Sequence, residues 1–298
     1  MKSLDVAGFP RFTDAAATFL KEHCEGADIT KAVFAVAGPV EADRCVLTNC
    51  SWVIDARELY QTFGLEAWII NDFEAVAHSL PSLTAADLVK IGGGEAELAA
   101  PMVVLGPGTG LGVASLVSRL VTPIVIPSEG GHATFGGTGS DREDDIVRHL
   151  RRRFGHVSAE RVISGEGLEN IYQAIVTFDQ LNLVPQGAPE ITKRALSNDC
   201  QVAREALERF CAFLGSFAGS VVLMIGARGG AYIAGGISPR ILDFMSRSEF
   251  RSRFEAKGRF RPYLERVPTQ VIVHPAAAFL GLASLSNIVN PDHDAAKP

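Results

Sequence analysis

Closely paired cysteines are missing from this sequence of 298 residues. Its five cysteines are scattered, their number is odd, and no two stand at CxxC spacing: Cys24, Cys45, Cys50, Cys200 and Cys211. A disulfide framework and a zinc site both need a regular Cys pattern, so neither is indicated. Because free thiols suit a reducing compartment, we expect the protein to be cytoplasmic.

A dominant basic surface is missing too. Lys and Arg together number 28 against 34 Asp and Glu, which gives a formal net charge of −6. The one short basic run, at 148–153, is expected to be a solvated helix face. Proteins that bind nucleic acid usually carry a basic patch or stripe, so no nucleic-acid partner is expected.

Long apolar runs are also scarce. The N-terminus has no apolar core of a signal peptide. Residues 210–227 are free of charge and contain Gly215-x-x-x-Gly219, so their length touches that of a membrane span. This run continues a helical pattern that begins at Val202 among charged residues, and it leads straight into a strand-like segment. A buried central helix is therefore favoured over a membrane span.

The sequence does contain the alternation of an α/β protein. Its composition is 47% hydrophobic and 21% charged, and its length is commonly divided between two domains. Strands are predicted at 31–36, 45–47, 67–70, 102–105, 113–117, 123–126, 231–234 and 271–273, and helices at 13–23, 55–63, from 141 onward, 202–227 and 276–288. Strands alternating with helices favour a parallel or mixed sheet. Gly165-x-Gly167 is expected to interrupt the helical pattern, and 251–266 to be a charged, exposed region.

The strand at 67–70 ends in Asn71 and Asp72, after which a helix begins. Open α/β sheets place ligand chemistry at the carboxyl ends of their strands. There Asp72 could accept a proton from a substrate hydroxyl that Asn71 orients. Asp and Asn are also favoured helix N-caps, so a purely structural role for Asp72 stays open at this point.

Two glycine-rich turns follow strands. The first is Gly106-Pro107-Gly108-Thr109-Gly110-Leu111-Gly112, whose backbone N–H groups could face a phosphate. The second is Gly235-Gly236, which precedes Ser238-Pro239 and forms an opening suited to a nucleotide. A tight hairpin and a well-capped turn would use the same glycines, so both structural alternatives remain.

A carboxylate and an imidazole stand close together in Glu129-Gly130-Gly131-His132. Such a pair suits a polyhydroxylated ligand, because carboxylates accept hydrogen bonds and imidazole can donate or accept. The alternatives are a bare turn and a buried structural imidazole. Metal binding is not expected, since no second His lies at ligand spacing. Glu160 could equally be a surface charge in the first turn of a helix.

Six motifs in order resemble the bacterial ATP-dependent glucokinase family, within the actin-like sugar kinases. They are Thr-Asn-x-x-Trp at 48–52, Ile-Ile-Asn-Asp-Phe at 69–73, Gly-x-Gly-Thr-Gly-Leu-Gly at 106–112, Glu-Gly-Gly-His at 129–132, Gly-His-Val-Ser-Ala-Glu-Arg at 155–161 and Ala-Gly-Gly-Ile at 234–237. The repressor/kinase branch carries a Cys-rich zinc motif after its Glu-x-Gly-His, and none follows here. The resemblance is therefore to the non-zinc branch.

This resemblance implies two α/β lobes with ribonuclease H-like cores. A small lobe would comprise 1–82 plus 276–298, and a large lobe 83–275. Asp72 would be the base that takes the proton from the glucose 6-hydroxyl, and the sugar ligands would be Asn71, Asp72, Glu129, His132 and Glu160. The nucleotide would be held by Gly106, Gly108, Thr109, Gly110, Gly235 and Gly236. ATP with Mg²⁺, glucose as substrate and a homodimer are further family expectations.

One family feature has no counterpart in the sequence. Family members begin with a hairpin that carries Asp-x-Gly-Gly-Thr, the first phosphate loop, whose Asp helps position Mg²⁺. Residue 1 falls where the family is finishing its third strand, so we expect an N-terminally truncated small lobe with an exposed sheet edge. A late start codon and a natural truncation would both explain this. The alternative to a working glucokinase is an impaired sugar- or nucleotide-binding remnant, and a different hexose as substrate is a third option.

Overall fold

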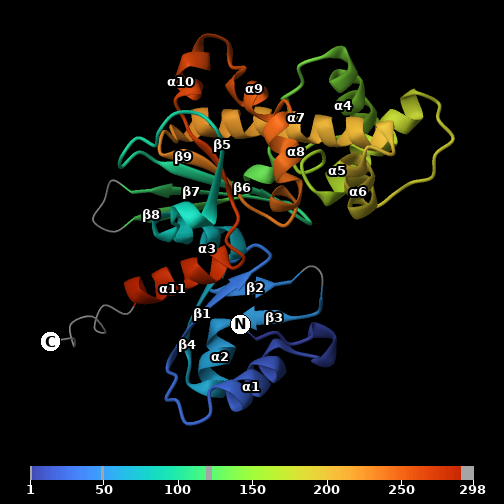
Figure 1. The fold of residues 1–298 in the computed structure, drawn as a ribbon. Coiled ribbons are helices and arrows are strands. Elements are labelled where there is room, and N and C mark those ends of the chain that lie inside the picture. The colour runs from blue at the N-terminus through green and yellow to red at the C-terminus, as the bar shows by residue number, and fades with distance from the viewer. Residues whose placement is uncertain (1, 48–49, 119–122, 290–298) are drawn as a thin grey trace. The chain divides into compact units, whose positions relative to one another are not determined.

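The computed structural model describes residues 2–47, 50–118 and 123–289 of the chain (Figure 1). The chain divides into two compact units. Unit 1 comprises Met1–Ser82 together with Ala276–Pro298, and unit 2 comprises Leu83–Pro275. Each unit is an α/β assembly in its own right.

Unit 1 is built around the parallel pair β1 and β4, which align from Lys31 opposite Glu66 to Val36 opposite Asn71. A short antiparallel pair, β2 and β3, lies beside the cluster formed by Val36, Cys45, Ile54, Leu59 and Ile69. Its elements are η1 (Val6–Gly8), α1 (Phe12–His23), β1 (Lys31–Val36), β2 (Arg44–Val46), β3 (Val53–Asp55), α2 (Ala56–Phe63), β4 (Glu66–Asn71), α3 (Asp72–Ser79), η2 (Leu80–Ser82) and α11 (Ala277–Val289).

Local sequence explains where the helices of unit 1 begin and end. Asp55 caps α2 by accepting a hydrogen bond from the Arg57 N–H over 2.9 Å, and Gly64 ends the helix in the left-handed region at φ 70°. α11 packs on α3 so closely at Gly281 that a side chain there would collide with the Ala75 carbonyl. A glycine is therefore required where these two helix backbones meet.

Unit 2 is organised around a mixed sheet in the order β5-β10-β9-β6-β7-β8. β9 runs parallel to both β6 and β10, while β5, β7 and β8 are antiparallel to their neighbours. The strands are β5 (Leu88–Gly92), β6 (Met102–Pro107), β7 (Leu111–Val117), β8 (Ile124–Ser128), β9 (Gly230–Ile233) and β10 (Thr269–Ile272). The α-helices are α4 (Asp141–Phe154), α5 (Gly165–Phe178), α6 (Ala188–Ser197), α7 (Gln201–Ile225), α8 (Leu242–Arg247), α9 (Phe250–Glu255) and α10 (Arg261–Glu265). The 3-10 turns are η3 (Ala85–Asp87), η4 (Gly130–His132), η5 (Ser238–Ile241) and η6 (Gly258–Phe260).

Helix α7 is the central helix of unit 2 (Figure 1). By length and composition it is apolar enough to cross a membrane, but 67% of its most apolar window is buried within the protein. Gly215 and Gly219 lie against the backbone carbonyls of Phe250 and Phe254, where no side chain would fit. These contacts are those of a core helix, as the sequence pattern predicted.

Several local predictions were wrong. Gly165 and Gly167 do not interrupt a helix but begin α5, because Ser164 caps it by accepting from the Gly167 N–H over 2.9 Å. The charged stretch 251–266, by contrast, is exposed or half-buried as predicted except at Phe254 and Leu264, and it contains α10 and most of α9. Strands β3 and β5 were not predicted.

Candidate functional site

The glycine-rich turn at 106–112, here called the phosphate turn, is the tip of the β6–β7 hairpin. Its register pairs Gly106 with Gly112 and Pro107 with Leu111. The Gly108 N–H donates to the Gly110 carbonyl over 2.8 Å and closes the turn. The hairpin interpretation is therefore right for the backbone, and it leaves open what the turn binds.

The N-terminus of helix α5 lies beside the phosphate turn. The Gly165 N–H donates to the Gly108 carbonyl over 2.8 Å, which holds the first residue of the helix against the turn. A helix N-terminus carries partial positive charge and free N–H groups, so it favours anions. The turn and the helix end together form surroundings suited to phosphate.

A hollow of about 400 Å³ opens at this point of unit 2. Its walls come from the phosphate turn, the start of α5, the first turns of α6 and the loop after β9: Gly108, Thr109, Gly165, Ala188, Pro189, Thr192, Gly236, Ile237 and Arg240. Gly235 packs against the Pro107 carbonyl at a φ of 83°, a conformation that favours glycine. Gly106 is buried within β6. Of the nucleotide residues predicted from sequence, Gly108, Thr109 and Gly236 thus line one hollow.

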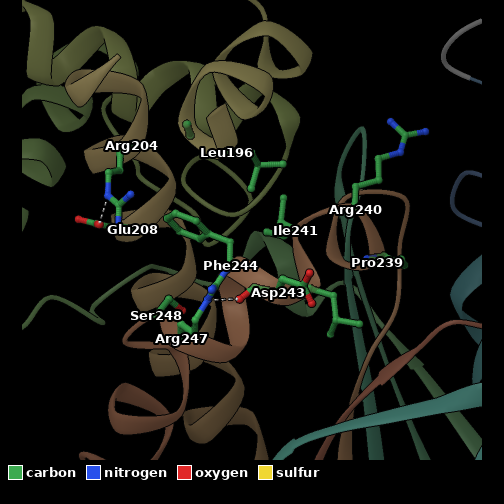
Figure 2. A pocket seen from close by; sticks show the side chains of 12 residues that line it. Leu196, Arg204, Glu208, Pro239, Arg240, Ile241, Asp243, Phe244, Arg247 and Ser248 are labelled. Carbon is green, nitrogen blue, oxygen red and sulfur yellow. Dashed lines mark hydrogen bonds and ion pairs between the residues drawn. The ribbon is translucent and has the colours of Figure 1, made fainter. Parts of the chain in front are cut away.

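A second hollow, of about 670 Å³, shares Arg240 with the first (Figure 2). α6, α7 and α8 surround it, and its wall carries both charges. Arg204 donates from Nε to Glu208 over 3.1 Å, and Arg247 donates from Nε to the Asp243 carbonyl over 3.0 Å. Within the described residues Arg240 makes no ion pair, so its guanidinium is the cation left available beside the first hollow.

Sequence reasoning missed Arg240, Thr192 and the α5 terminus. Arg240 directly follows Ser238-Pro239, so the pattern that predicted the opening could have drawn attention to it. Thr192 lies far along the chain from the glycine turns. Only the packing of α6 against α5 and α7 reveals its place, and no local signal marks it.

Three predicted sugar ligands lie together in unit 2. The Nε2 atom of His132 is 3.8 Å from Oε2 of Glu129, and its Nδ1 is 3.9 Å from Oε1 of Glu160. The side chain of His132 is 62% exposed, so it is not a buried structural imidazole. Glu160 lies in the turn between α4 and α5 rather than in the first turn of a helix. The buried imidazole considered for His132 and the helical first turn considered for Glu160 are therefore both wrong.

Backbone hydrogen bonds fasten the segment 129–135 to the segment 157–160. Glu160 N–H donates to the Gly131 carbonyl, Ala159 N–H to the Ala133 carbonyl and Phe135 N–H to the Val157 carbonyl, each over 2.9 Å. The Leu111 N–H donates to Oε2 of Glu160, also over 2.9 Å. This last bond joins the segment 157–160 to the phosphate turn through a side chain.

Asn71 and Asp72 lie in unit 1, at the junction of β4 and α3. Asn71 is the N-cap: its Oδ1 accepts from the Phe73 N–H over 2.8 Å. Asp72 is the first helical residue, and its Oδ1 also accepts from the Phe73 N–H over 2.9 Å. The capping role considered for Asp72 therefore belongs chiefly to Asn71. Thr48 and Asn49 of the first motif lie outside the described residues, while the indole of Trp52 donates to the Phe9 carbonyl over 2.9 Å.

Two ionisable residues of α3 sit in partly apolar surroundings. Burial raises the pKa of Glu74, although a backbone hydrogen bond at Asn71 opposes this effect. Burial lowers the pKa of His78 from its ordinary 6.5. In both cases desolvation disfavours the charged form.

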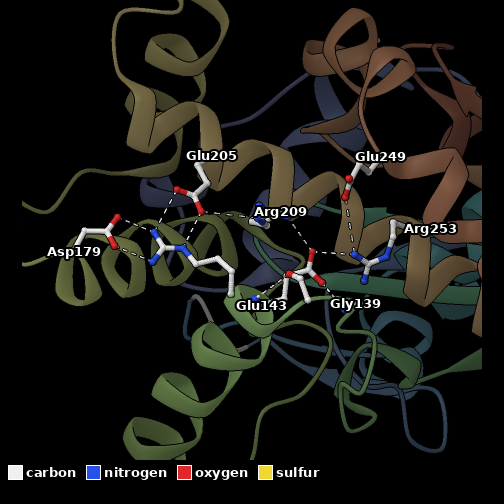
Figure 3. A network of polar contacts seen from close by, with 9 residues as sticks. Gly139, Glu143, Asp179, Glu205, Arg209, Glu249 and Arg253 are labelled. Atoms are coloured by element: carbon white, nitrogen blue, oxygen red, sulfur yellow. Dashed lines mark hydrogen bonds and ion pairs between the residues drawn. The ribbon is translucent and has the colours of Figure 1, made fainter.

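A buried carboxylate anchors the loop that follows the segment 129–135. Figure 3 shows Glu143 between Arg209 and Arg253. Glu143 is fully buried, and its Oε2 accepts from the Gly139 N–H over 2.6 Å. Arg253 donates to Oε1 of Glu143 over 2.9 Å and to the Gly137 carbonyl over 2.7 Å. The loop is thus held from both sides by one ion-pair network.

Within the part of the chain that the structure describes, no group of three or more His, Cys, Asp and Glu side chains is arranged to hold a metal ion. Kinases usually bind Mg²⁺ through substrate phosphates, water and one or two carboxylates rather than through an all-protein cage.

The family model described as "Glucokinase" matches residues 1–288 of the chain. The glucokinase of Paramagnetospirillum magneticum is 45% identical over 273 residues, covering 91% of this chain and 85% of that protein. The glucokinase of Photorhabdus laumondii is 44% identical over 254 residues, covering 85% of this chain and 79% of its own length. Each relative is thus matched over most of its length.

Solved structures share the fold. A glucokinase from an Antarctic psychrotroph superposes with a TM-score of 0.86 at 33% identity, covering 95% of this chain and 88% of that one. A ROK family glucokinase from Streptomyces griseus, solved with glucose and AMPPNP, has a TM-score of 0.62 at 18% identity, covering 93% of this chain and 88% of its own. The predicted α/β sugar-kinase fold is confirmed.

Proposed function

We propose that this chain, which belongs to the glucokinase family, transfers the γ-phosphoryl group of ATP to the 6-hydroxyl of glucose. The products are glucose 6-phosphate and ADP, and the reaction is the entry step of glycolysis. The observation that carries the proposal is 45% identity to a glucokinase over 91% of the chain. An impaired binding remnant is not favoured, because the relatives matched over most of the chain are glucokinases.

The sugar side of the reaction is assigned to Asn71, Asp72, Glu129, His132 and Glu160. Carboxylates accept hydrogen bonds from neighbouring hydroxyls, and bonds to an ionised acceptor are stronger than neutral ones. The mutual arrangement of Glu129, His132 and Glu160 supports this role, since the polar atoms of the exposed Glu129 and His132 and of the half-buried Glu160 face one another. An exposed cluster of acceptors beside an imidazole suits a neutral polyol.

Asp72 is the proposed general base. It accepts the proton from the glucose 6-hydroxyl as that oxygen bonds to the γ-phosphorus, and the bond from the γ-phosphorus to the bridging oxygen of ADP breaks. Phosphoryl transfer demands little covalent chemistry from the protein, so positioning and charge stabilisation dominate. The position of Asp72 directly after strand β4 supports this role, because open α/β sheets place ligand chemistry at the carboxyl ends of their strands.

The nucleotide is proposed to bind at the phosphate turn and the adjoining hollow. The turn residues Gly106, Gly108, Thr109 and Gly110 would hold the phosphates, with Gly235 and Gly236 against the adenosine. Because the Gly108 N–H already closes the turn, the backbone N–H groups that would face the phosphates are those of Thr109 and Gly110. The α5 terminus adds partial positive charge to the phosphate end. Arg240 supplies a cation at the edge of the same hollow.

Further family expectations remain proposals. Mg²⁺ would arrive bound to the ATP phosphates, where it neutralises charge that develops during transfer. Units 1 and 2 would be the small and large lobes, 1–82 plus 276–298 and 83–275. A homodimer in the cytoplasm is likewise proposed from family resemblance.

The test is glucose-dependent formation of ADP by the purified 298-residue chain. Reactions with glucose, mannose and fructose run side by side give kcat/KM for each, and the product is identified by an enzyme specific for glucose 6-phosphate. We expect glucose to have the highest kcat/KM. ADP formation that does not depend on any hexose, or no turnover above an Asp72→Ala control, would contradict the proposal.

A further inference from the structure

We infer that Glu160 is a positioning residue for the phosphate turn as well as a sugar ligand, and that it couples the binding of sugar to the binding of nucleotide. This inference rests on the proposed function, because it assigns the turn to ATP and the residues around His132 to glucose. It concerns only residues of unit 2.

The two oxygens of the Glu160 carboxylate face different groups. Oε2 accepts a hydrogen bond from the Leu111 N–H over 2.9 Å, and Leu111 lies in the phosphate turn, opposite Pro107. Oε1 lies 3.9 Å from Nδ1 of His132, on the sugar side. The side chain is 31% exposed. Oε2 is engaged by the Leu111 N–H, whereas Oε1 accepts no hydrogen bond within the described residues, which leaves it available to a ligand.

The packing around this bond leaves little freedom. A Cβ atom built on Gly110 would lie 2.6 Å from Oε2 of Glu160, and one built on Gly131 would collide with the Leu111 carbonyl. The Glu160 N–H donates to the Gly131 carbonyl over 2.9 Å. The Glu160 carboxylate, the phosphate turn and the segment 129–135 are therefore in direct contact. A displacement of the carboxylate must also displace the turn.

The energetic consequence follows from charge and order. A hydrogen bond to an ionised carboxylate is stronger than a neutral one, so Glu160 contributes appreciably to holding the Leu111 amide in place. A sugar hydroxyl bound to Oε1 would reduce the freedom of the whole carboxylate. Glucose would then leave a better ordered turn for the phosphates, and the two ligands would each raise the other's affinity by the same factor.

The experiment measures ADP binding by calorimetry in the absence and presence of saturating glucose, for the full chain and three variants. Glu160→Ala removes both interactions. Glu160→Gln keeps a carbonyl oxygen that can accept from the Leu111 N–H. Glu129→Ala is the matched control, because Glu129 contacts His132 but makes no hydrogen bond to the turn within the described residues.

Without glucose, Glu160→Ala is expected to weaken ADP binding about tenfold, and Glu129→Ala by less than about twofold. Glu160→Gln should restore most of the ADP affinity while glucose affinity stays reduced. Amide hydrogen exchange across 106–112 should be faster in Glu160→Ala than in Glu160→Gln. A merely structural defect would not produce this rescue, and a thermal unfolding curve confirms that each variant is folded.

The inference is overturned if Glu160→Ala lowers glucose affinity but leaves ADP affinity and exchange at 106–112 unchanged, since Glu160 is then only a sugar ligand. It is also overturned if glucose has no effect on ADP affinity in the unmodified chain. Failure of the proposed function is separate: the unmodified chain would then lack glucose-dependent ADP formation, whereas the exchange at 106–112 would still decide the role of Glu160 in the turn.

Discussion

The side chain of Asn71 donates a hydrogen bond from Nδ2 to the Gly38 carbonyl over 3.2 Å. Its Oδ1 accepts from the Phe73 N–H over 2.8 Å, so one amide links the loop after β1 to the first turn of α3. That first turn carries Asp72. One hydrogen of Nδ2 is still available for a ligand after these two bonds are made, because an amide NH₂ has two donors.

Replacing Asn71 separates its two roles. Asn71→Ala removes the cap and should lower the free energy of unfolding by about 1 kcal/mol. Asn71→Asp keeps an acceptor for the Phe73 N–H but cannot donate to Gly38, so it should cost less stability. Both should lower kcat, because both release the link that orients the helix start. Urea unfolding with kinetics on the same preparations measures this, and equal loss of stability in the two variants would argue against the cap.

The buried network around Glu143 should dominate the stability of unit 2. Glu143→Ala leaves Arg209 and Arg253 without their buried partner, and breaking such a pair typically costs about 3–5 kcal/mol. The control is Glu208→Ala, which breaks an exposed ion pair with Arg204 and should cost about 0–1 kcal/mol. Denaturant unfolding compares the two. Similar losses of unfolding free energy in both variants would show that burial of the Glu143 ion pairs does not add to stability.

The stability of unit 1 should depend on His78 as the pH falls. Burial lowers the pKa of His78 below its ordinary 6.5, so the folded state disfavours the protonated imidazole. The resulting stability is present above the ordinary value and is lost as the pH falls through the folded pKa. The Tm of thermal unfolding should therefore fall less between pH 7.5 and pH 5 in His78→Gln than in the unmodified chain. If Tm falls with pH by the same amount in both proteins, the lowered pKa of His78 is contradicted.

A substitution in the phosphate turn should weaken glucose binding. An added Cβ at Gly110 would lie 2.6 Å from Oε2 of Glu160, so Gly110→Ala must push the carboxylate aside. An added Cβ at Gly108 meets nothing within 4 Å, which makes Gly108→Ala the matched control for glucose affinity. Calorimetry with glucose and no nucleotide should show weaker binding only for Gly110→Ala. Equal glucose affinities would show that the carboxylate adjusts without consequence.

Much of the fold could be predicted because local signals coincided with tertiary packing. Asp55 and Gly64 marked both ends of α2, and the charge-free run 210–227 was placed correctly in a core helix. The errors came where packing overrode a local rule. Gly167 lies inside a helix because its lack of a side chain allows contact with the Val162 backbone, although glycine usually weakens a helix.

The candidate site could be predicted only as separate pieces. The sequence identified Glu129, His132 and Glu160 as polar residues with possible structural alternatives, and the structure brings their side chains together. The bond from Leu111 to Glu160 spans 49 positions of the chain and depends on how a hairpin meets a distant turn. No periodicity or motif encodes such a contact, and the same holds for the place of Thr192 in the nucleotide hollow.

The most direct test of the central claim compares Asp72→Ala with Asp55→Ala. Asp55 ends strand β3 and Asp72 directly follows β4, and both lie at the start of a helix in unit 1, but only Asp72 is assigned to catalysis. Kinetics of glucose phosphorylation are measured with glucose affinity on the same samples. Asp72→Ala should lose about 10²–10⁴-fold in kcat with glucose affinity largely retained, while Asp55→Ala keeps its kcat and loses only stability. If Asp72→Ala retains its kcat, or loses glucose affinity in proportion to its rate, Asp72 is not the base and the account is contradicted.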